Sequence, residues 1–225
     1  STIKNWLQFD EKGQLIQDDA SFKQHIVDYV AQLAADHDTV GTERQFQTTS
    51  GRTVSVSGSA YGWKIDQTKE TAALVSLIKN GEQTSREPEY SQKAASHSGN
   101  DYGNTYVEIN LTAQHLYFYA NGKLLVESDF VSGNAAKGWS TPAGAYSITY
   151  KQRNATLKGQ GYATPVSYWM PFNGGVGFHD ASWQPTFGGS RYQTNGSHGC
   201  VNMPPEMAGK LFELISAGTP VVVHN

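Results

Sequence analysis

The stretch Ser197-His198-Gly199-Cys200-Val201-Asn202 holds the only cysteine of the chain, and His179 lies twenty-one positions upstream of that cysteine. A thiol attacks a carbonyl carbon only as its thiolate, and a neighbouring imidazole can take up the thiol proton and later return it to a leaving amine. The stretch therefore indicates a thiol nucleophile served by a histidine.

The composition restricts the classes of protein that the chain can belong to. Its 225 residues are enough for one large domain or two small ones, and either can bury a core. A hydrophobic content of 38% and a mean hydropathy of -0.50 are typical of a soluble globular protein. The net charge is -3 and no basic block is present, so we expect no nucleic-acid partner.

The sequence contains no apolar run near the roughly 20 residues that a membrane helix needs, and no recognisable signal peptide. Because signal peptides are removed and sequences are often given in part, this leaves the compartment open. A single cysteine excludes an internal disulfide.

The amino-terminal part has a mixed pattern. Apolar side chains at helical spacing predict helices over about 19–35 and 71–78, the second stopped by Gly81, and alternation predicts a strand over 53–57. The segment 91–103 is small and polar, which is typical of a linker. We therefore predict an α+β amino-terminal domain over 1–100, with the linker at its end, and a second domain over 104–225.

The second domain is predicted to be mostly β. Asn121-Gly122 between two apolar runs indicates a type I′ hairpin turn, because both residues tolerate positive φ angles. One clear helix is expected, with Pro204-Pro205 at its start, an apolar face and Gly218 after its end. Met207, Leu211, Leu214 and Ile215 form that face. Strands are predicted over 107–111, 115–119, 124–131, 144–150 and 220–223.

The residues around Cys200 suggest how a thiol would work. His198 lies two positions before Cys200, and residues i and i+2 of an extended segment share a face. Gly199 leaves the backbone accessible, so its N–H and that of Cys200 are candidates for an oxyanion hole. His179 follows the glycine-rich run 174–178. The spacing leaves open which histidine is the base.

A histidine, a spacer of this length and then Ser/Thr-His-Gly-Cys-hydrophobic-Asn is the pattern of a known family, and every position of it is present. The chain resembles the L,D-transpeptidase (YkuD-type) catalytic domain, a cysteine acyltransferase family that cross-links bacterial peptidoglycan. Thr141-Pro142-Ala143-Gly144 resembles the element that precedes a central strand in these domains. The resemblance implies a YkuD-like β-sandwich.

The resemblance also implies roles for single residues. Cys200 would be the nucleophile and His179 its general base, held in one tautomer by the backbone carbonyl of Asp180. The carboxylate of Asp180 is the less favoured alternative for that role. His198 would then bind substrate or support the oxyanion.

Further residues would line or support the site. Ser197 and Asn202 would hold the nucleophile loop through hydrogen bonds, and Gly199 would contribute to the oxyanion hole. The run 183–192 lies where the family carries substrate-facing residues, so Arg191 and Tyr192 are expected to bind a peptide carboxylate or line the acyl-donor groove. Alternatively, Arg191 is exposed to solvent and Tyr192 packs in the protein interior, without a role in binding. No metal ligand or cofactor is predicted.

The stretch Ser59-Ala60-Tyr61-Gly62-Trp63-Lys64-Ile65-Asp66, the helix after it and Arg86-Glu87-Pro88 resemble the peptidoglycan-binding domain that precedes the catalytic domain in some Gram-positive L,D-transpeptidases. Tyr61 and Trp63 are alternatively core aromatics. The resemblance implies an extracytoplasmic location in the cell wall or on a membrane anchor that faces it, in a Gram-positive bacterium. The anchor would be a segment outside the given sequence.

The implied reaction is a two-step acyl transfer. The thiolate of Cys200 attacks the third-residue carbonyl of a donor tetrapeptide stem, D-Ala leaves, and an acceptor side-chain amine takes the acyl group to give a 3→3 cross-link. Water as acceptor would make the protein an L,D-carboxypeptidase. The partners implied are donor and acceptor stem peptides, and carbapenems as inhibitors that acylate Cys200.

Three other functions fit parts of the pattern. In papain-like peptidases the histidine follows the cysteine by many residues, whereas only His224 follows Cys200 here. A metal site could use His179, His198 and Cys200 but lacks an obvious fourth ligand. A noncatalytic wall-binding protein would not need the intact cysteine and both histidines.

Overall fold

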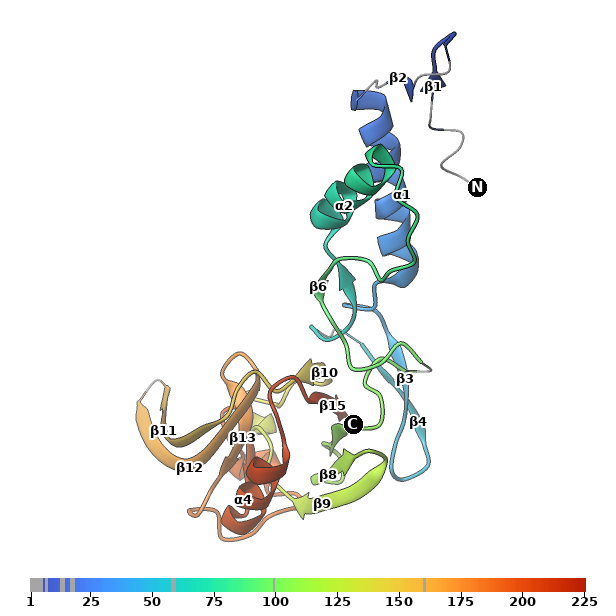
Figure 1. Ribbon diagram of the computed structural model, residues 1–225. Coiled ribbons are helices and arrows are strands. Elements are labelled where there is room, and N and C mark those ends of the chain that lie inside the picture. Colours follow the sequence, from blue (N-terminus) through green and yellow to red (C-terminus); the bar gives the residue numbers. More distant parts are fainter. Residues whose placement is uncertain are drawn as a thin grey trace. The chain divides into compact units, whose positions relative to one another are not determined.

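The computed structural model describes residues 6, 8–12, 15–16, 19–57, 60–98, 100–159 and 161–225 (Figure 1). Ser59 and Gly99, which belong to stretches named above, lie outside the described residues. The chain divides into two compact units, one of residues 1–40 and 62–93 and the other of residues 41–61 and 94–225. One of these divisions, between Lys93 and Ala94, falls within the predicted linker, whereas the sequence pattern did not indicate that 41–61 joins the second unit.

Two helices form the first unit, as the hydrophobic spacing predicts. Asp66 caps the second of them, because its Oδ1 accepts a hydrogen bond from the Lys69 N–H at 3.0 Å. Ile26 and Val30 of the first helix are buried against apolar side chains of the second. The elements of this unit are β1 (Gln8–Phe9), β2 (Leu15–Ile16), α1 (Asp19–His37), β5 (Lys64–Ile65), α2 (Gln67–Lys79) and β6 (Tyr90–Gln92).

An ion pair with a buried carboxylate holds the segment after α2 against that helix. Arg86 donates to both carboxylate oxygens of Glu70, at 2.9 and 3.0 Å, and the Glu89 N–H donates to the same carboxylate at 2.8 Å. In the first unit, Trp63 is a core aromatic that packs on Tyr90. Arg86 and Trp63, two residues of the stretches that resemble a peptidoglycan-binding domain, therefore both make contacts that stabilise the fold.

The second unit contains a five-stranded sheet in the order β10-β15-β7-β8-β9 and a four-stranded sheet in the order β11-β12-β13-β14. Most neighbours are antiparallel, but β15 pairs with β7 and β13 with β14 in parallel. The elements are β3 (Arg44–Gln47), β4 (Thr53–Val56), β7 (Tyr106–Asn110), β8 (His115–Ala120), β9 (Lys123–Asp129), η2 (Ala135–Lys137), β10 (Gly144–Ser147), β11 (Gln152–Gly159), β12 (Tyr162–Asn173), β13 (Val176–Asp180), α3 (Tyr192–Asn195), β14 (Val201–Met203), α4 (Pro205–Leu214) and β15 (Pro220–His224).

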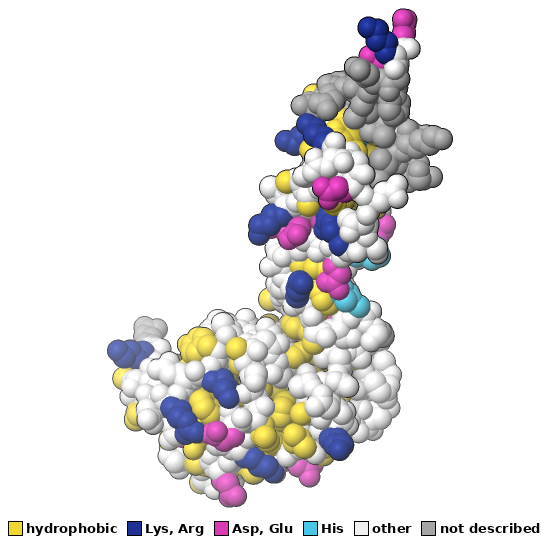
Figure 2. Space-filling model, viewed as in Figure 1, with side chains coloured by type: hydrophobic (Ala, Val, Ile, Leu, Met, Phe, Trp, Pro, Cys, Tyr) yellow, Lys and Arg dark blue, Asp and Glu magenta, His cyan; other side chains and the backbone are white. Residues whose placement is uncertain are grey.

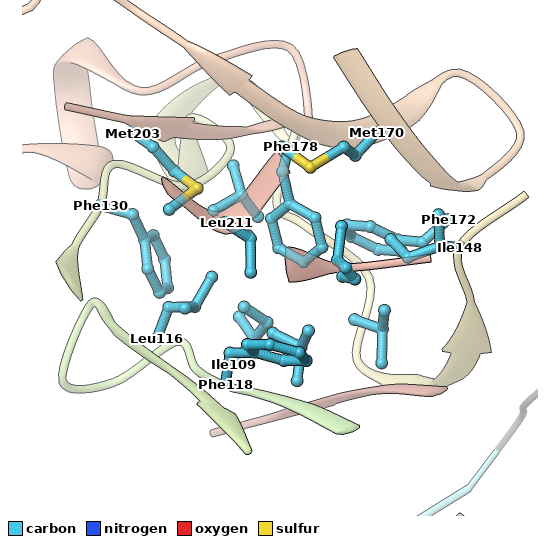
Figure 3. Close-up of a cluster of buried hydrophobic side chains, with 14 of the residues drawn as sticks. Ile109, Leu116, Phe118, Phe130, Ile148, Met170, Phe172, Phe178, Met203 and Leu211 are labelled. Carbon is cyan, nitrogen blue, oxygen red and sulfur yellow. The ribbon is translucent and has the colours of Figure 1, made fainter. Parts of the chain in front are cut away.

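The main core lies between these two sheets. Figure 3 shows Met170, Phe178 and Met203 of the four-stranded sheet directed toward Leu116 and Phe118 of the five-stranded sheet, and all five are buried. The predicted fold class, an α+β amino-terminal part followed by a mostly β sandwich with one clear helix, is confirmed.

The predicted hairpin turn in this unit is confirmed, whereas the predictions for Leu214 and for the strand after Gly144 differ from the structure. Asn121 and Gly122 have φ angles of 50° and 75°, as a type I′ turn requires. Leu214 is 45% exposed rather than on the apolar face of α4, because it is the last helical residue and Leu211 and Phe212 make the buried contacts. The strand after Thr141-Pro142-Ala143-Gly144, β10, lies at the edge of its sheet rather than at the centre.

The segment 41–61 packs as part of the second unit. Its hairpin, β3 and β4, buries Phe46 and Val56 in a small core with Tyr102, Ala145 and Val222. Arg44 forms an ion pair with Asp101 at 2.7 Å. This segment therefore contributes core side chains to the domain that carries Cys200.

A buried carboxylate connects the hairpin to the five-stranded sheet. Glu108 of β7 is 0% exposed and accepts hydrogen bonds from the Thr49 N–H at 2.9 Å and the Thr49 hydroxyl at 2.5 Å. His224 of β15 places its Nε2 3.1 Å from the same carboxylate. Every partner of Glu108 comes from a distant part of the chain, so the contact depends on the tertiary fold.

The surface mixes charges of both signs. Basic and acidic side chains are scattered among uncharged ones on the face shown in Figure 2. No helix within the described ranges is long and apolar enough to cross a membrane.

Glu108→Ala is expected to lower the free energy of unfolding by about 3–5 kcal/mol, because it leaves the buried His224 and both donors of Thr49 without their partner. Urea unfolding followed by circular dichroism measures this. Glu127→Ala, at an exposed position on β9, is the control and should change that free energy by less than about 0.5 kcal/mol. Equal effects of the two substitutions would show that the buried network does not stabilise the domain.

Candidate active site

The parallel pair β13 and β14 places the candidate residues on one face of the four-stranded sheet. Phe178 pairs with Val201, and His179 pairs with Asn202. Phe178 and Val201 point into the main core. Since side chains alternate along a strand, His179 and Asn202 lie on the opposite face. Cys200, which directly precedes β14, packs against the apolar cluster that contains Trp169, the register partner of His179.

His179 is held in one orientation. It is 4% exposed, and its Nδ1 lies 2.9 Å from the backbone oxygen of Asp180, the contact that the resemblance implied. The carboxylate of Asp180 instead accepts the N–H of Tyr168 at 2.8 Å, so it does not orient the ring. Burial lowers the pKa of His179, and the Asp180 carbonyl opposes this shift. The imidazole is therefore kept neutral.

Two tryptophans flank His179. The ring centroid of Trp169 on β12 lies 6.1 Å from that of His179. The exposed Trp183 stacks on the His179 ring, with the two centroids 5.8 Å apart. Trp169 also belongs to a small apolar cluster with Ala155 and Val166, against which Cys200 packs. The thiol and the imidazole thus lie beside the same cluster.

Cys200 is half-buried beside β13. Its Sγ donates to the backbone oxygen of Gly175 at 3.5 Å. Burial raises the pKa of the Cys200 thiol to about 11, against the opposing effect of a hydrogen bond from the Gly177 N–H. At neutral pH the group is therefore a thiol, and forming its thiolate requires a base.

Hydrogen bonds from two hydroxyls hold the loop before Cys200. The Ser197 hydroxyl donates to the Cys200 backbone oxygen at 2.6 Å and accepts the Gly199 N–H at 3.0 Å. The Thr141 hydroxyl donates to the Gly199 oxygen at 2.7 Å. Ser197 therefore makes the loop contacts that the resemblance implies, and the Gly199 N–H, one of the two predicted oxyanion donors, is engaged within the loop.

The prediction that His198 to Cys200 form an extended segment is wrong. These residues form bends, and Gly199 has a φ angle of 119°, in the region that favours glycine. The positive φ angle removes the simple alternation that would place the side chains of His198 and Cys200 together.

His198 lies in an aromatic stack that sequence reasoning missed. Its ring centroid is 4.2 Å from that of Trp139 and 4.7 Å from that of Tyr162, with interplanar angles of 26° and 25°. Trp139 and Tyr162 lie far from His198 in the sequence, and no local pattern connects them to it. The stack connects Tyr162, at the start of β12, to the loop before Cys200.

Arg191 and Tyr192 lie at the start of α3. The Nε of Arg191 donates to the Gln184 side chain at 2.6 Å. Tyr192 lines a pocket of about 430 Å³ with Ser132, Thr141 and other residues, and Cys200 is not among those that line it. The described contacts therefore do not bring either residue to the thiol.

No cluster of three or more metal-ligating side chains occurs within the described residues. His198 lies between two aromatic rings, as given above. The contacts of the three candidate ligands are with backbone atoms and aromatic rings.

Family comparison adds to this geometry. Residues 104–223 match the YkuD family, described as "L,D-transpeptidase catalytic domain". The chain belongs to the L,D-transpeptidase family. Residues 23–86 match a second family, described as "Putative peptidoglycan binding domain".

Solved L,D-transpeptidase structures extend the likeness over nearly the whole chain. A cysteine-to-serine mutant of the Enterococcus faecium L,D-transpeptidase is 35% identical, with a TM-score of 0.83, over 98% of this chain and 88% of that one. The Ldtfm–avibactam carbamoyl enzyme is also 35% identical, with a TM-score of 0.83, over 99% and 86%. The catalytic domain from E. faecium is 44% identical, with a TM-score of 0.50, over 57% and 100%. A comparison with curated proteins finds no match.

Gly177→Ala is expected to destabilise this L,D-transpeptidase by about 1–3 kcal/mol through overpacking. The added Cβ would lie 2.6 Å from the Met170 backbone oxygen and 2.8 Å from Cη2 of Trp169, and the backbone of β12 cannot move away freely. Urea unfolding measures the effect. Gly175→Ala is the matched control, since its Cβ meets nothing within 4 Å, and equal stability of the two variants would contradict the prediction.

His198→Phe is expected to keep acylation by a carbapenem within about three-fold of the wild-type rate, whereas His198→Ala should lose about ten-fold, because only phenylalanine preserves two aromatic stacks. Mass spectrometry of the intact protein over time gives both rates. If phenylalanine is as slow as alanine, the imidazole of His198 has a chemical role that stacking does not explain.

Proposed function

We propose that this L,D-transpeptidase uses Cys200 as nucleophile and His179 as general base to transfer the acyl group of a donor tetrapeptide stem to an acceptor amine. The observation that carries the proposal is that both residues lie by the same aromatic side chain: the ring centroid of His179 lies 6.1 Å from that of Trp169, and Cys200 packs against the apolar cluster that contains Trp169. The orientation of His179 by the Asp180 carbonyl supports its role as the base.

The protonation states fit a thiol activated on demand. The pKa of Cys200 is raised to about 11 and that of His179 is lowered, so both groups are neutral in the resting enzyme. Since Nδ1 of His179 donates to Asp180, its Nε2 carries the lone pair that accepts the thiol proton. Sulfur then attacks the carbonyl of the third stem residue.

The imidazolium returns the proton to the amine of the departing D-Ala, and a thioester remains on Cys200. The side-chain amine of an acceptor stem attacks this thioester and yields the 3→3 cross-link. With water as acceptor the same intermediate gives L,D-carboxypeptidase activity. The burial of His179 beside two tryptophans supports cross-linking, since excluding water protects the thioester.

The oxyanion would be bound by the backbone N–H of Cys200. The Gly199 N–H already has a partner in Ser197, so its share in the oxyanion hole would require that hydrogen bond to be shared or exchanged. Arg191 and Tyr192 would meet the more distant part of the donor stem. Arg191 is hydrogen-bonded to Gln184 and Tyr192 lines the 430 Å³ pocket, so this role in binding the donor stem is a proposal.

The amino-terminal match supports association with the cell wall. We place the boundary between the two domains near 91–103, because the two family matches lie on either side of it. An extracytoplasmic location in a Gram-positive bacterium is also proposed, as the resemblance of the amino-terminal domain implies. The relative in its avibactam carbamoyl form supports acylation of Cys200 by β-lactam-like inhibitors, carbapenems included.

The proposal is tested with a disaccharide-tetrapeptide and mass spectrometry. Wild-type protein should release D-Ala and form a cross-linked dimer, and Cys200→Ala should do neither, because it has no nucleophile. A tripeptide product without dimer would instead assign L,D-carboxypeptidase activity.

The base is tested by the rate of carbapenem acylation. His179→Ala should be slower than wild type by about 100-fold or more, as for the loss of a general base. His115→Ala, on β8 outside the site, is the control and should acylate at the wild-type rate. If His179→Ala is acylated at the wild-type rate, another group must be the base.

A further inference from the structure

Asn202 contains a buried oxygen that no described residue satisfies. The residue is 3% exposed, and its Oδ1 has no hydrogen-bond partner within the described parts of the chain. Buried acceptors are nearly always paired, because leaving one unpaired forfeits the hydrogen bonds it would make in water. This oxygen therefore requires an explanation.

The position of Asn202 is set by its backbone. Its N–H donates to the Val131 oxygen, and its own oxygen accepts the Val131 N–H, both at 2.9 Å. On the other side it is the register partner of His179 in the parallel pair. Partners on adjacent strands lie about 5 Å apart and point to the same face, so the carboxamide and the imidazole are neighbours.

The tautomer of His179 accounts for the missing partner. Its Nδ1–H donates to the Asp180 oxygen, so Nε2 of the neutral ring is an acceptor. Two acceptors cannot hydrogen-bond to each other. The oxygen of Asn202 therefore gains a donor from this ring only when His179 is protonated.

We infer that Asn202 is a positioning residue whose Oδ1 accepts the Nε2–H of the His179 imidazolium. The inference rests on the proposed function, in which His179 is the base. A substrate is the weaker candidate for a partner, because the oxygen is buried.

The proton can be followed through each step. The S–H bond of Cys200 breaks as the Nε2–H bond of His179 forms, and at first the thiolate accepts this new N–H. Once sulfur bonds to the substrate carbon it carries no charge and accepts poorly. The oxygen of Asn202 then holds the N–H until the proton passes to the leaving amine, after which Nε2 is again an acceptor.

Two titratable groups lie next to His179 within the described residues. Cys200 lies on the adjoining loop, and Asp180 lies on β13 itself, with its carboxylate bonded to the Tyr168 N–H. Trp169 and Trp183 cover the ring and do not titrate. A change in the pKa of His179 on substitution of Asn202 would therefore report on the carboxamide.

The experiment compares Asn202→Leu and Asn202→Asp in carbapenem acylation as a function of pH. Leucine has a similar size and no acceptor, so acylation should slow by about 10- to 100-fold, and the acid limb of the profile, which reports the pKa of His179, should move to lower pH. Aspartate keeps the acceptor and adds charge, so this limb should move to higher pH and the rate above it should stay within about ten-fold of wild type.

Asn110→Leu is the matched control. Asn110 is buried on β7, and its Oδ1 accepts the Ala113 N–H at 2.8 Å, so this variant loses a buried contact away from the site. It should lose stability and keep the wild-type pH profile. Circular dichroism establishes that each variant is folded.

Each other outcome is decisive. An unchanged acid limb in both Asn202 variants would overturn the inference and leave a structural role. Equal loss of rate in the leucine and aspartate variants would assign the effect to the carboxamide N–H₂ and also overturn it. Absence of acylation in wild type would instead overturn the proposed function.

Discussion

The parallel register between β13 and β14 is the constraint on which the site depends. Phe178 and Val201 bury their side chains in the main core, and this fixes the opposite face for His179 and Asn202. A slip of one residue in either strand would turn its apolar side chain out and its polar one in. Core packing and the placement of His179 and Asn202 therefore depend on the same register, and neither can change without the other.

Small residues and hydroxyls shape the backbone around Cys200. Gly177 leaves room for Trp169 beside Cys200, and Gly199 allows the bend before it. Thr141 and Ser197 then hold the backbone oxygens of that bend. The polar groups of this loop are thus paired locally, which would help the proposed nucleophile to meet a carbonyl at one angle.

The sequence predicts local parts of this structure well and distant contacts poorly. The His179–Asp180 hydrogen bond and the Asn121-Gly122 turn are predictable because their atoms are adjacent in the chain. The stack on His198 and the packing of 41–61 in the second unit are not, because they join segments that only the folded chain brings together. The extended segment before Cys200 was wrongly predicted because the φ angle of a glycine cannot be read from its neighbours.

Burial explains why the site combines neutral groups with an unpaired acceptor. An apolar face raises the pKa of the thiol and lowers that of the imidazole, so the charged pair is the minor form at rest. A permanent donor to the Asn202 oxygen would not help the reaction, since only contacts that strengthen toward the transition state accelerate it. An acceptor satisfied only by the imidazolium meets that condition, so its lack of a partner in the resting state can be part of catalysis.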